Sequence, residues 1–384
     1  SHPVTNNNGN DQVQHVDIPT NAQLRGLARF RGPACVSIAL RTTPISRDVE
    51  PSRIEFGNLA HGALSQIDET MLSKSDRLKL EEVLADIADD DDFWQFQSES
   101  LVVFATPERV RTFRLPNHLS NDVQVSDRFH LPPLMRALAF PHSATVLVLG
   151  QGGVRVVGIT GNQAAGDIRL PDMPKDAASV ARKASISGRS PKRRLQGSEG
   201  QKVHLLAYAR RVDQALRPYL AGREDPLIVV ANEHLRSIFL SVCSHEHVIH
   251  GHPRGVGEDS SDLEIATASR ELIDELYATE VAELVETYRA RAGIRHATSK
   301  VTDIARSSTF GGVDTLLVNM DATLSGTVGE ADGIVSYADA GPGTYDIVSE
   351  LACRTLLTGG RVLSVRQEDL PESEPVAAIL RHPV

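Results

Sequence analysis

Residues 174–202 read PKDAASVARKASISGRSPKRRLQGSEGQK, and their charge is opposite in sign to that of the chain as a whole. Eight basic side chains stand against Asp176 and Glu199, a local charge of +6 in a 384-residue chain of net charge −10. The residues between them are rich in Ser, Gly and Pro and bury too little apolar surface to offset the entropy lost on ordering. We therefore predict a flexible basic arm. Its basic residues are Lys175, Arg182, Lys183, Arg189, Lys192, Arg193, Arg194 and Lys202.

A helix is predicted directly after this arm. Leu205, Ala209, Val212 and Leu216 are spaced i, i+4, i+7 and i+11, which places them on one helical face. The arm is thus mounted on a rigid amphipathic element. One interpretation is a solvated loop without a function. The other is an arm that binds a polyanion, above all RNA, because each phosphate contact releases counterions.

Length and composition limit the class of protein. A chain of 384 residues exceeds one ordinary core and predicts two or three domains. The acidic net charge excludes a general nucleic-acid coat, so RNA contacts must come from local patches. Cys35, Cys243 and Cys353 are odd in number and far apart, which disfavours a disulfide framework or a zinc ribbon. We see no run of eighteen apolar residues and no signal-peptide pattern, so we expect a cytoplasmic protein without membrane contact.

The N-terminal part predicts a small α+β domain. Residues 1–12 read as a disordered tail, and the domain follows at 13–137. Pro132-Pro133 is expected to close it. Strands are predicted at 35–40, 101–105, 110–115 and 123–129, and helices at 54–72 and 76–87.

The next 158 residues, 138–295, predict an α/β domain that includes the arm. Apolar strands at 145–149 and 154–159 flank a Gly-Gln-Gly-Gly turn and form a hairpin. A further strand at 226–231 precedes a helix at 233–242 that Asn232 is expected to cap. The domain ends with one long helix at 262–292, and this order of elements favours a sheet covered on both faces.

The C-terminal part, 297–384, alternates helix and strand and predicts a compact α/β/α domain. Gly311-Gly312 and Gly359-Gly360 are expected to end its two helices. The predicted helices lie at 299–307 and 345–357, and the predicted strands at 313–318, 334–337 and 361–365.

Four short motifs carry a family resemblance. They are DRFHLPPL at 127–134, GGVDTLLV at 311–318, TGGRV at 358–362 and PVAAILR at 375–381. In this order they resemble the bacterial archaeo-eukaryotic release factor-like (baeRF) proteins, which are similar to archaeal and eukaryotic class-1 release factors and to Pelota. The resemblance implies an N-terminal α+β domain, a central RNase H-like domain and a C-terminal domain similar to kink-turn-binding ribosomal proteins.

The same resemblance implies a role at the ribosome. Release factors carry a Gly-Gly-Gln loop just before a long helix of the central domain, and here the equivalent place reads Gly-Ser-Glu-Gly-Gln at 197–201. Only Gly200 and Gln201 match, whereas the Gly-Gln-Gly-Gly of 150–153 belongs to the hairpin. Because Pelota also lacks the tripeptide, we expect a non-catalytic factor that acts at the ribosomal A site in rescue, hibernation or stress-linked quality control. The candidate RNA-binding residues are Arg182, Lys183, Arg189, Lys192, Arg193, Arg194 and Lys202.

Expected partners are the ribosome and its rRNA, with a translational GTPase as a further candidate; we expect no DNA partner and no cofactor. Two other functions remain open: a peptidyl-tRNA hydrolase with a degenerate loop, and a protein scaffold that does not bind RNA.

A metal site and a nuclease site are weaker candidates. His245, His247, His250 and His252 are the possible ligands, but alternation along a strand would put the first pair and the second pair on different faces. Without a matching metal motif, an exposed strand edge and turn is the alternative. A nuclease needs several converging carboxylates, and the predicted strands at 145–149, 154–159 and 227–231 contain none.

Overall fold

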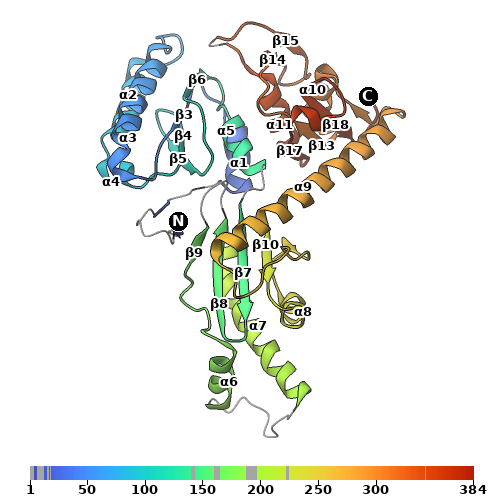
Figure 1. The fold of residues 1–384 in the computed structure, drawn as a ribbon. Coiled ribbons are helices and arrows are strands. Elements are labelled where there is room, and N and C mark those ends of the chain that lie inside the picture. The colour runs from blue at the N-terminus through green and yellow to red at the C-terminus, as the bar shows by residue number, and fades with distance from the viewer. Residues whose placement is uncertain are drawn as a thin grey trace. The chain divides into compact units, whose positions relative to one another are not determined.

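The computed structural model describes residues 4–6, 13–14, 17, 19–139, 143–159, 165–186, 197–221, 225–341 and 343–384. The chain divides into two units (Figure 1). The first unit contains residues 14–140 and 278–384, and the second contains residues 141–277 with a short N-terminal segment. The chain contains both helices and strands, and its mixed α/β type agrees with the prediction. Among the described helices, none is long and apolar enough to cross a bilayer.

An antiparallel sheet in the order β5-β4-β3-β6 forms the N-terminal part of the first unit. Its strands are β3 (Cys35–Arg41), β4 (Ser100–Ala105), β5 (Val110–Leu115) and β6 (Asp122–Ser126). The helices are α1 (Asn21–Arg29), α2 (Glu50–Ser65), α3 (Lys74–Ala88), α4 (Asp91–Gln95) and α5 (Pro132–Ala139), with a 3-10 turn at Ser46–Asp48.

Both faces of this sheet are covered. Ile38 and Val103 pack with Phe56 of α2 on one face, whereas Val102 and Phe104 belong to a second core on the other face. A strand buried on both faces reads as a continuous apolar run, and all six residues of β4 are buried.

Several boundaries in this part differ from the predictions, and the strand predicted at 123–129 ends at Ser126. Pro132 and Pro133 were expected to close the domain and are found in the first turn of helix α5, where proline is tolerated because its missing N–H has no intrahelical partner. The helix predicted at 54–72 begins earlier, with Pro51 in its first turn, and ends at Ser65.

The second unit is built on a seven-stranded sheet in the order β11-β10-β7-β8-β9-β1-β2. The strands are β1 (Val4–Asn6), β2 (Val13–Gln14), β7 (Ala144–Gly150), β8 (Gly153–Ile159), β9 (Gly166–Ile168), β10 (Leu227–Val230) and β11 (Val248–Ile249). β7, β8 and β9 are antiparallel neighbours, and β10 is parallel to both β7 and β11. Val4–Asn6 lie within the stretch predicted as a tail, yet they pair with β9.

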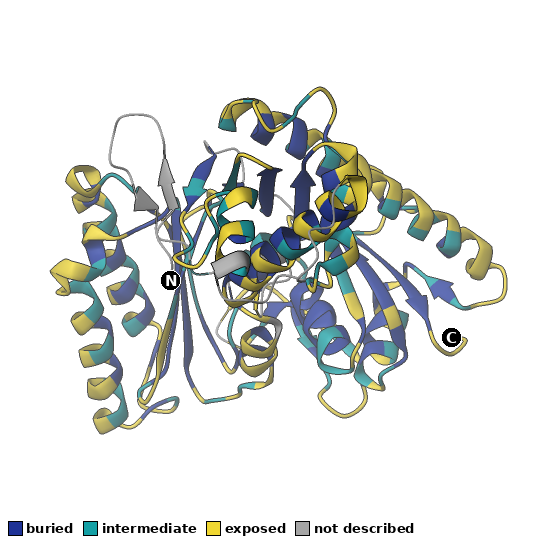
Figure 2. Ribbon diagram, turned by 90° about the horizontal axis from the view of Figure 1, so that it is seen from below, coloured by how far each residue is buried: buried dark blue, intermediate teal, exposed yellow. Residues whose placement is uncertain are grey.

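Helices cover both faces of this sheet, as its order of elements predicts. They are α6 (Ala177–Ile186), α7 (Ser198–Leu220), α8 (Glu233–Val242) and α9 (Asp262–Ala292). α7 and α8 pack on the face that contains Leu147 and Val229, and the first part of α9 packs on the face of Val146 and Ile228. Figure 2 shows by colour that strands of the molecule are mostly buried and that helices expose one side.

The C-terminal part of the first unit contains two sheets, in the orders β12-β18-β13-β17 and β15-β14-β16. The strands are β12 (Ala297–Thr298), β13 (Val313–Val318), β14 (Ser325–Val328), β15 (Val335–Tyr337), β16 (Tyr345–Asp346), β17 (Arg361–Ser364) and β18 (Val376–Leu380). The helices are α10 (Val301–Thr309) and α11 (Ile347–Leu357), with a 3-10 turn at Gln367–Asp369. Four of these strands were not predicted: β12, β14, β16 and β18. The helix predicted at 345–357 starts later because Asp346 caps it and accepts from the Val348 and Ser349 N–H groups.

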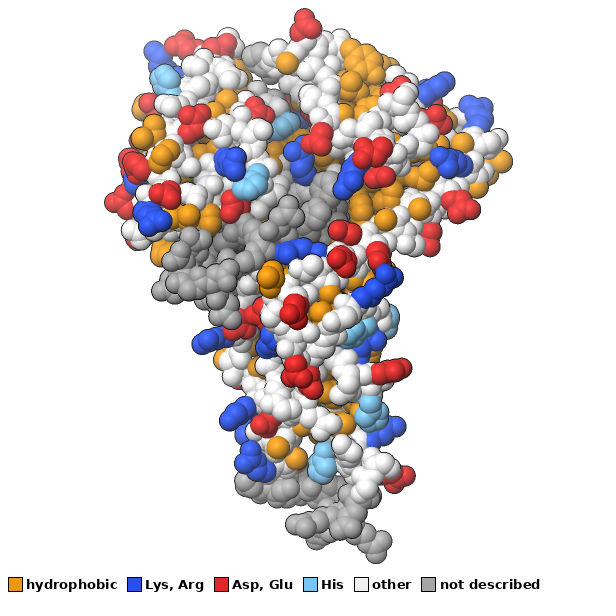
Figure 3. Space-filling view, in the orientation of Figure 1, with side chains coloured by type: hydrophobic (Ala, Val, Ile, Leu, Met, Phe, Trp, Pro, Cys, Tyr) orange, Lys and Arg blue, Asp and Glu red, His pale blue; other side chains and the backbone are white. Residues whose placement is uncertain are grey.

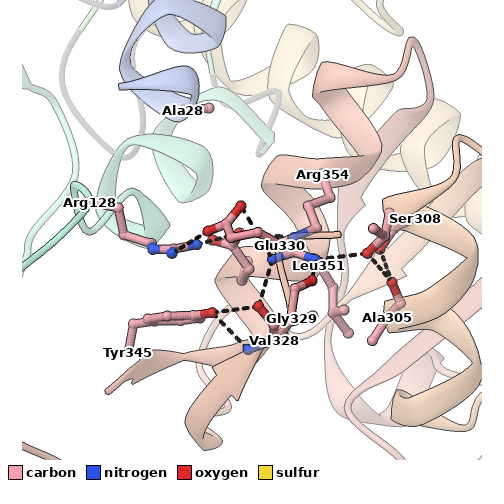
Figure 4. Close-up of polar contacts among 12 residues, drawn as sticks. Ala28, Arg128, Ala305, Ser308, Val328, Gly329, Glu330, Tyr345, Leu351 and Arg354 are labelled. Atoms are coloured by element: carbon pink, nitrogen blue, oxygen red, sulfur yellow. Dashed lines mark hydrogen bonds and ion pairs between the residues drawn. The ribbon is translucent and has the colours of Figure 1, made fainter. Parts of the chain in front are cut away.

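A cluster of ion pairs joins the two parts of the first unit (Figure 4). Arg128, which follows β6, donates to Glu350 of α11 and to Glu330, in each case at 2.6 Å. Arg354 also donates to Glu350, at 3.0 Å, and to the Val328 carbonyl, at 2.9 Å. Because each buried charge faces an opposite charge, the cluster satisfies groups that would otherwise be costly to bury.

Candidate nucleic-acid interface

The first third of the predicted arm is helical. Residues 177–186 form α6, so the prediction of an irregular stretch from residue 174 was wrong there. Asp176 caps this helix by accepting from the Ser179 N–H at 2.7 Å, and the hydrogen bonds from Ser179 hold the pKa of the Asp176 carboxyl below its usual range. Arg182 and Lys183 of α6 are exposed.

The stretch at the place of the Gly-Gly-Gln loop also belongs to a helix, from Ser198 onward. α7 begins at Ser198 after Gly197, whose φ of 95° favours glycine, and the Gln201 N–H donates to the Gly197 carbonyl at 3.2 Å. Gly200 is buried, whereas Gln201 and Lys202 are exposed. Release factors carry a loop at the equivalent position, whereas here residues 198–201 form the first turn of α7.

The core of the second unit fixes both helices. The predicted apolar face of α7 is confirmed, since Leu205, Ala209, Val212 and Leu216 are all buried. The buried Tyr208 hydroxyl donates to the Gly150 carbonyl at 2.7 Å, and burial raises the pKa of that hydroxyl. The N-terminus of α6 is held at the same hairpin turn, where the Ala177 N–H donates to the Gln151 carbonyl at 2.9 Å.

The structure therefore places three residues of the predicted basic set on two adjacent helices. Arg182, Lys183 and Lys202 lie on two helices that pack against each other, and Figure 3 shows Lys and Arg side chains gathered where α6 lies. The other four candidates lie outside the described residues: Arg189, Lys192, Arg193 and Arg194.

Sequence reasoning missed two cations of α7. Arg210 and Arg211 are exposed beside the apolar face and line a groove shared with α6. The helical spacing could have identified both arginines, because residues of an amphipathic helix that lie outside its apolar stripe face solvent. Lys175, which was counted in the arm's charge only, lines the same groove.

The histidine candidates do not form a metal site. His245 and His247 are close, with ring centroids 5.7 Å apart, but the His245 Nε2 is 3.0 Å from the Asp225 carbonyl oxygen. The His252 Nδ1 lies 2.7 Å from the Pro253 carbonyl oxygen, and His250 is exposed. Throughout the described ranges, no three His, Cys, Asp or Glu side chains meet in a way that could hold a metal ion. Strand β11 contains only Val248 and Ile249, so the predicted alternation of histidines along one strand was wrong.

Strand β9 brings one carboxylate into the central sheet. Asp167 was not considered as a nuclease residue, because this strand was not predicted. It lies 3.6 Å from the Arg169 guanidinium, and the described parts of β7, β8 and β10 contribute no second carboxylate. Two-metal chemistry needs several converging carboxylates. The described strands β7, β8, β9 and β10 provide one, that of Asp167.

Comparison with known proteins places the second unit in a class. Residues 141–279 match a family model, which confirms for these residues the predicted relationship to bacterial proteins that resemble archaeal and eukaryotic release factors. The model is that of bacterial archaeo-eukaryotic release factor family 11. No curated protein matches the chain.

Solved structures with distant similarity span most of the chain. The archaeal translation termination factor aRF1 is 14% identical, with 95% of this chain and 99% of that chain covered and a TM-score of 0.24. Ribosome-bound archaeal Pelota is 12% identical, with full coverage of both chains and a TM-score of 0.37. Dom34 of S. cerevisiae, a translation termination-like factor, is 12% identical, with 72% and 73% covered and a TM-score of 0.38.

Proposed function

We propose that this protein is a non-catalytic, ribosome-associated factor that binds RNA at the A site through the basic end of its second unit. One observation carries the proposal: exposed cations on α6 and α7 flank a segment with four more basic residues in an otherwise acidic chain. The family match supports a translation-related role. The roles that we propose for this binding are rescue of stalled ribosomes, hibernation or stress-linked quality control.

The remaining expectations follow from the same resemblance. The strand order β9-β8-β7-β10-β11, antiparallel then parallel, supports an RNase H-like central domain. We propose domains at 13–137, 138–295 and 297–384, the last similar to kink-turn-binding ribosomal proteins. A translational GTPase is the proposed protein partner, and binding to ribosomes would place the protein in the cytoplasm.

Co-sedimentation with ribosomes tests the proposal. If three to six phosphates are contacted, the affinity should fall by about one to three decades between 50 and 200 mM salt, because each contact releases counterions. Pelleting of the protein without ribosomes serves as the blank. A flat salt response, or no pelleting with ribosomes at low salt, would favour the scaffold alternative.

A further inference from the structure

A groove of about 760 Å³ lies between α6, the loop that precedes it and α7. Pro171, Met173 and Pro174 line it from the loop, Val180 and Ala184 from α6, and Ala207 from α7. Val180 belongs to the core of the second unit, and Met173 and Ala207 pack against that core. The groove therefore has an apolar floor supported by the fold, and its volume is in the range typical of small-ligand sites.

Four cations line the same groove: Lys175, Lys183, Arg210 and Arg211. All four are exposed, and among the described residues none of them has a hydrogen-bond or ion-pair partner. One carboxylate, that of Asp172, accompanies them, so the lining retains three positive charges. Adjacent cations repel each other, and a ligand that carries about three negative charges would relieve that repulsion.

An apolar floor beside unpaired cations selects a ligand with both characters. Inorganic phosphate would leave the floor unused, and an apolar ligand would leave the cations unpaired. A phosphorylated nucleoside has a base and ribose for the floor and phosphates for the guanidinium groups, which bind phosphate oxygens in a planar, bidentate geometry. We propose that this groove binds a nucleotide of an RNA strand, with the neighbouring phosphates on Arg210, Arg211 and Lys183.

This inference rests on the proposed RNA-binding role and adds the place where the strand is held. The groove should discriminate little between base types. Among the described residues of its lining none has an aromatic ring, so base stacking contributes little. We expect purine and pyrimidine strands to bind with similar affinity. With three phosphates held, the affinity should fall about 20-fold between 50 and 200 mM salt.

Fluorescence polarisation with a labelled octa-adenylate RNA tests the groove in the full chain. Arg210→Gln/Arg211→Gln should weaken binding at least tenfold, because two of the phosphate-binding cations are lost. Ala207→Phe fills the floor without a change of charge and should weaken binding as well. Arg289→Gln/Arg291→Gln, two exposed arginines of α9, is the matched control and should bind like the wild type. Wild-type affinity in both groove variants would overturn the proposal.

A competition experiment distinguishes an RNA strand from a free nucleotide or a free phosphate compound as the ligand of the groove. ADP should displace the labelled RNA better than pyrophosphate, because only ADP uses the apolar floor; equal displacement would overturn the proposal. The RNA should bind at least tenfold more tightly than ADP, since it offers several phosphates, and tighter ADP binding would assign the groove to a free nucleotide instead of a strand. Failure to pellet with ribosomes, with intact octa-adenylate binding, would overturn the proposed function and leave the groove assignment standing.

Discussion

The Arg128 guanidinium donates to the Glu350 carboxylate at 2.6 Å, although the two residues are 222 positions apart in the chain. Both side chains are buried, and the guanidinium carbon also lies 4.0 Å from the centroid of the Tyr345 ring. Burial alone would lower the pKa of Arg128, but the hydrogen bond to Asp127 and the charge of Glu350 raise it above its usual value. This pair ties the end of β6 to α11 within the first unit.

Arg128→Ala should therefore destabilise the protein by about 3 kcal/mol, because it removes one partner of a buried pair and leaves the other charge less compensated. Urea unfolding followed by circular dichroism measures the change. Arg366→Ala is the control, since Arg366 and Glu368 form an exposed pair at 4.0 Å and such pairs contribute under about 1 kcal/mol. Equal stability of the two variants would show that the pair does not support the first unit.

Asp346 should make stability depend on pH. Burial raises the pKa of its carboxyl from 3.8 to about 6, although the N–H groups of Leu324, Ser349 and Val348 lower it in part. Because this pKa is higher in the folded state than in the unfolded chain, folding favours the protonated acid. The protonated carboxyl therefore contributes up to about 3 kcal/mol to the free energy of unfolding below pH 4, and this contribution is lost as the pH rises through about 6.

Asp346→Asn removes this titration but retains one oxygen, which can accept the hydrogen bonds that Oδ1 accepts from the Leu324 and Val348 N–H groups. The stability of the variant relative to the wild type should therefore increase between pH 4 and pH 7. Urea titrations of both proteins at several pH values measure that difference. A constant difference across the range would mean that Asp346 titrates alike in the folded and unfolded chains.

Arg182→Ala/Lys183→Ala/Lys202→Ala should weaken ribosome binding at least tenfold at 50 mM salt, because three phosphate contacts are lost. The melting temperature should change little, since all three side chains are exposed. A second triple variant, Lys192→Ala/Arg193→Ala/Arg194→Ala, tests the basic residues outside the described ranges in the same assay. Lys74→Ala/Lys79→Ala in α3 removes exposed lysines elsewhere and should leave binding unchanged. Unaltered sedimentation of both triple variants would contradict the assignment of the basic surface.

The protein should not release peptides from peptidyl-tRNA. Hydrolysis needs a small, uncharged loop tip that can approach the ester and position water. Such positioning lowers the activation barrier by several kcal/mol. Here Gly200 is buried in the first turn of α7, beside the charged Glu199. Release of labelled formyl-methionine from programmed ribosomes measures the activity. Release well above the background without factor, abolished by Gln201→Ala, would restore the hydrolase alternative.

Local patterns in the chain predicted much of the fold. The limits of α8 and α9, and the cap of α8 by Asn232, agree with the predictions because helical spacing and capping depend on neighbours within a few residues. The limits of β5 and β13 agree for a similar reason, since a strand is short and bounded by turn residues. The basic character of the arm and the buried face of α7 also follow from sequence alone.

Tertiary structure decided the rest. Helix α6 has only two apolar side chains larger than that of alanine, and it is ordered by the Asp176 cap, its packing on α7 and the hydrogen bond from Ala177 to the hairpin turn. The groove arises only where α6 and α7 meet, so Lys175 and Arg210 share a lining that no spacing in the chain reveals. Likewise, Arg128 and Glu350 are both ordinary charged residues in the sequence, and only folding removes them from water together. Contacts between distant residues depend on the packing of whole elements, and one-dimensional periodicity does not contain that information.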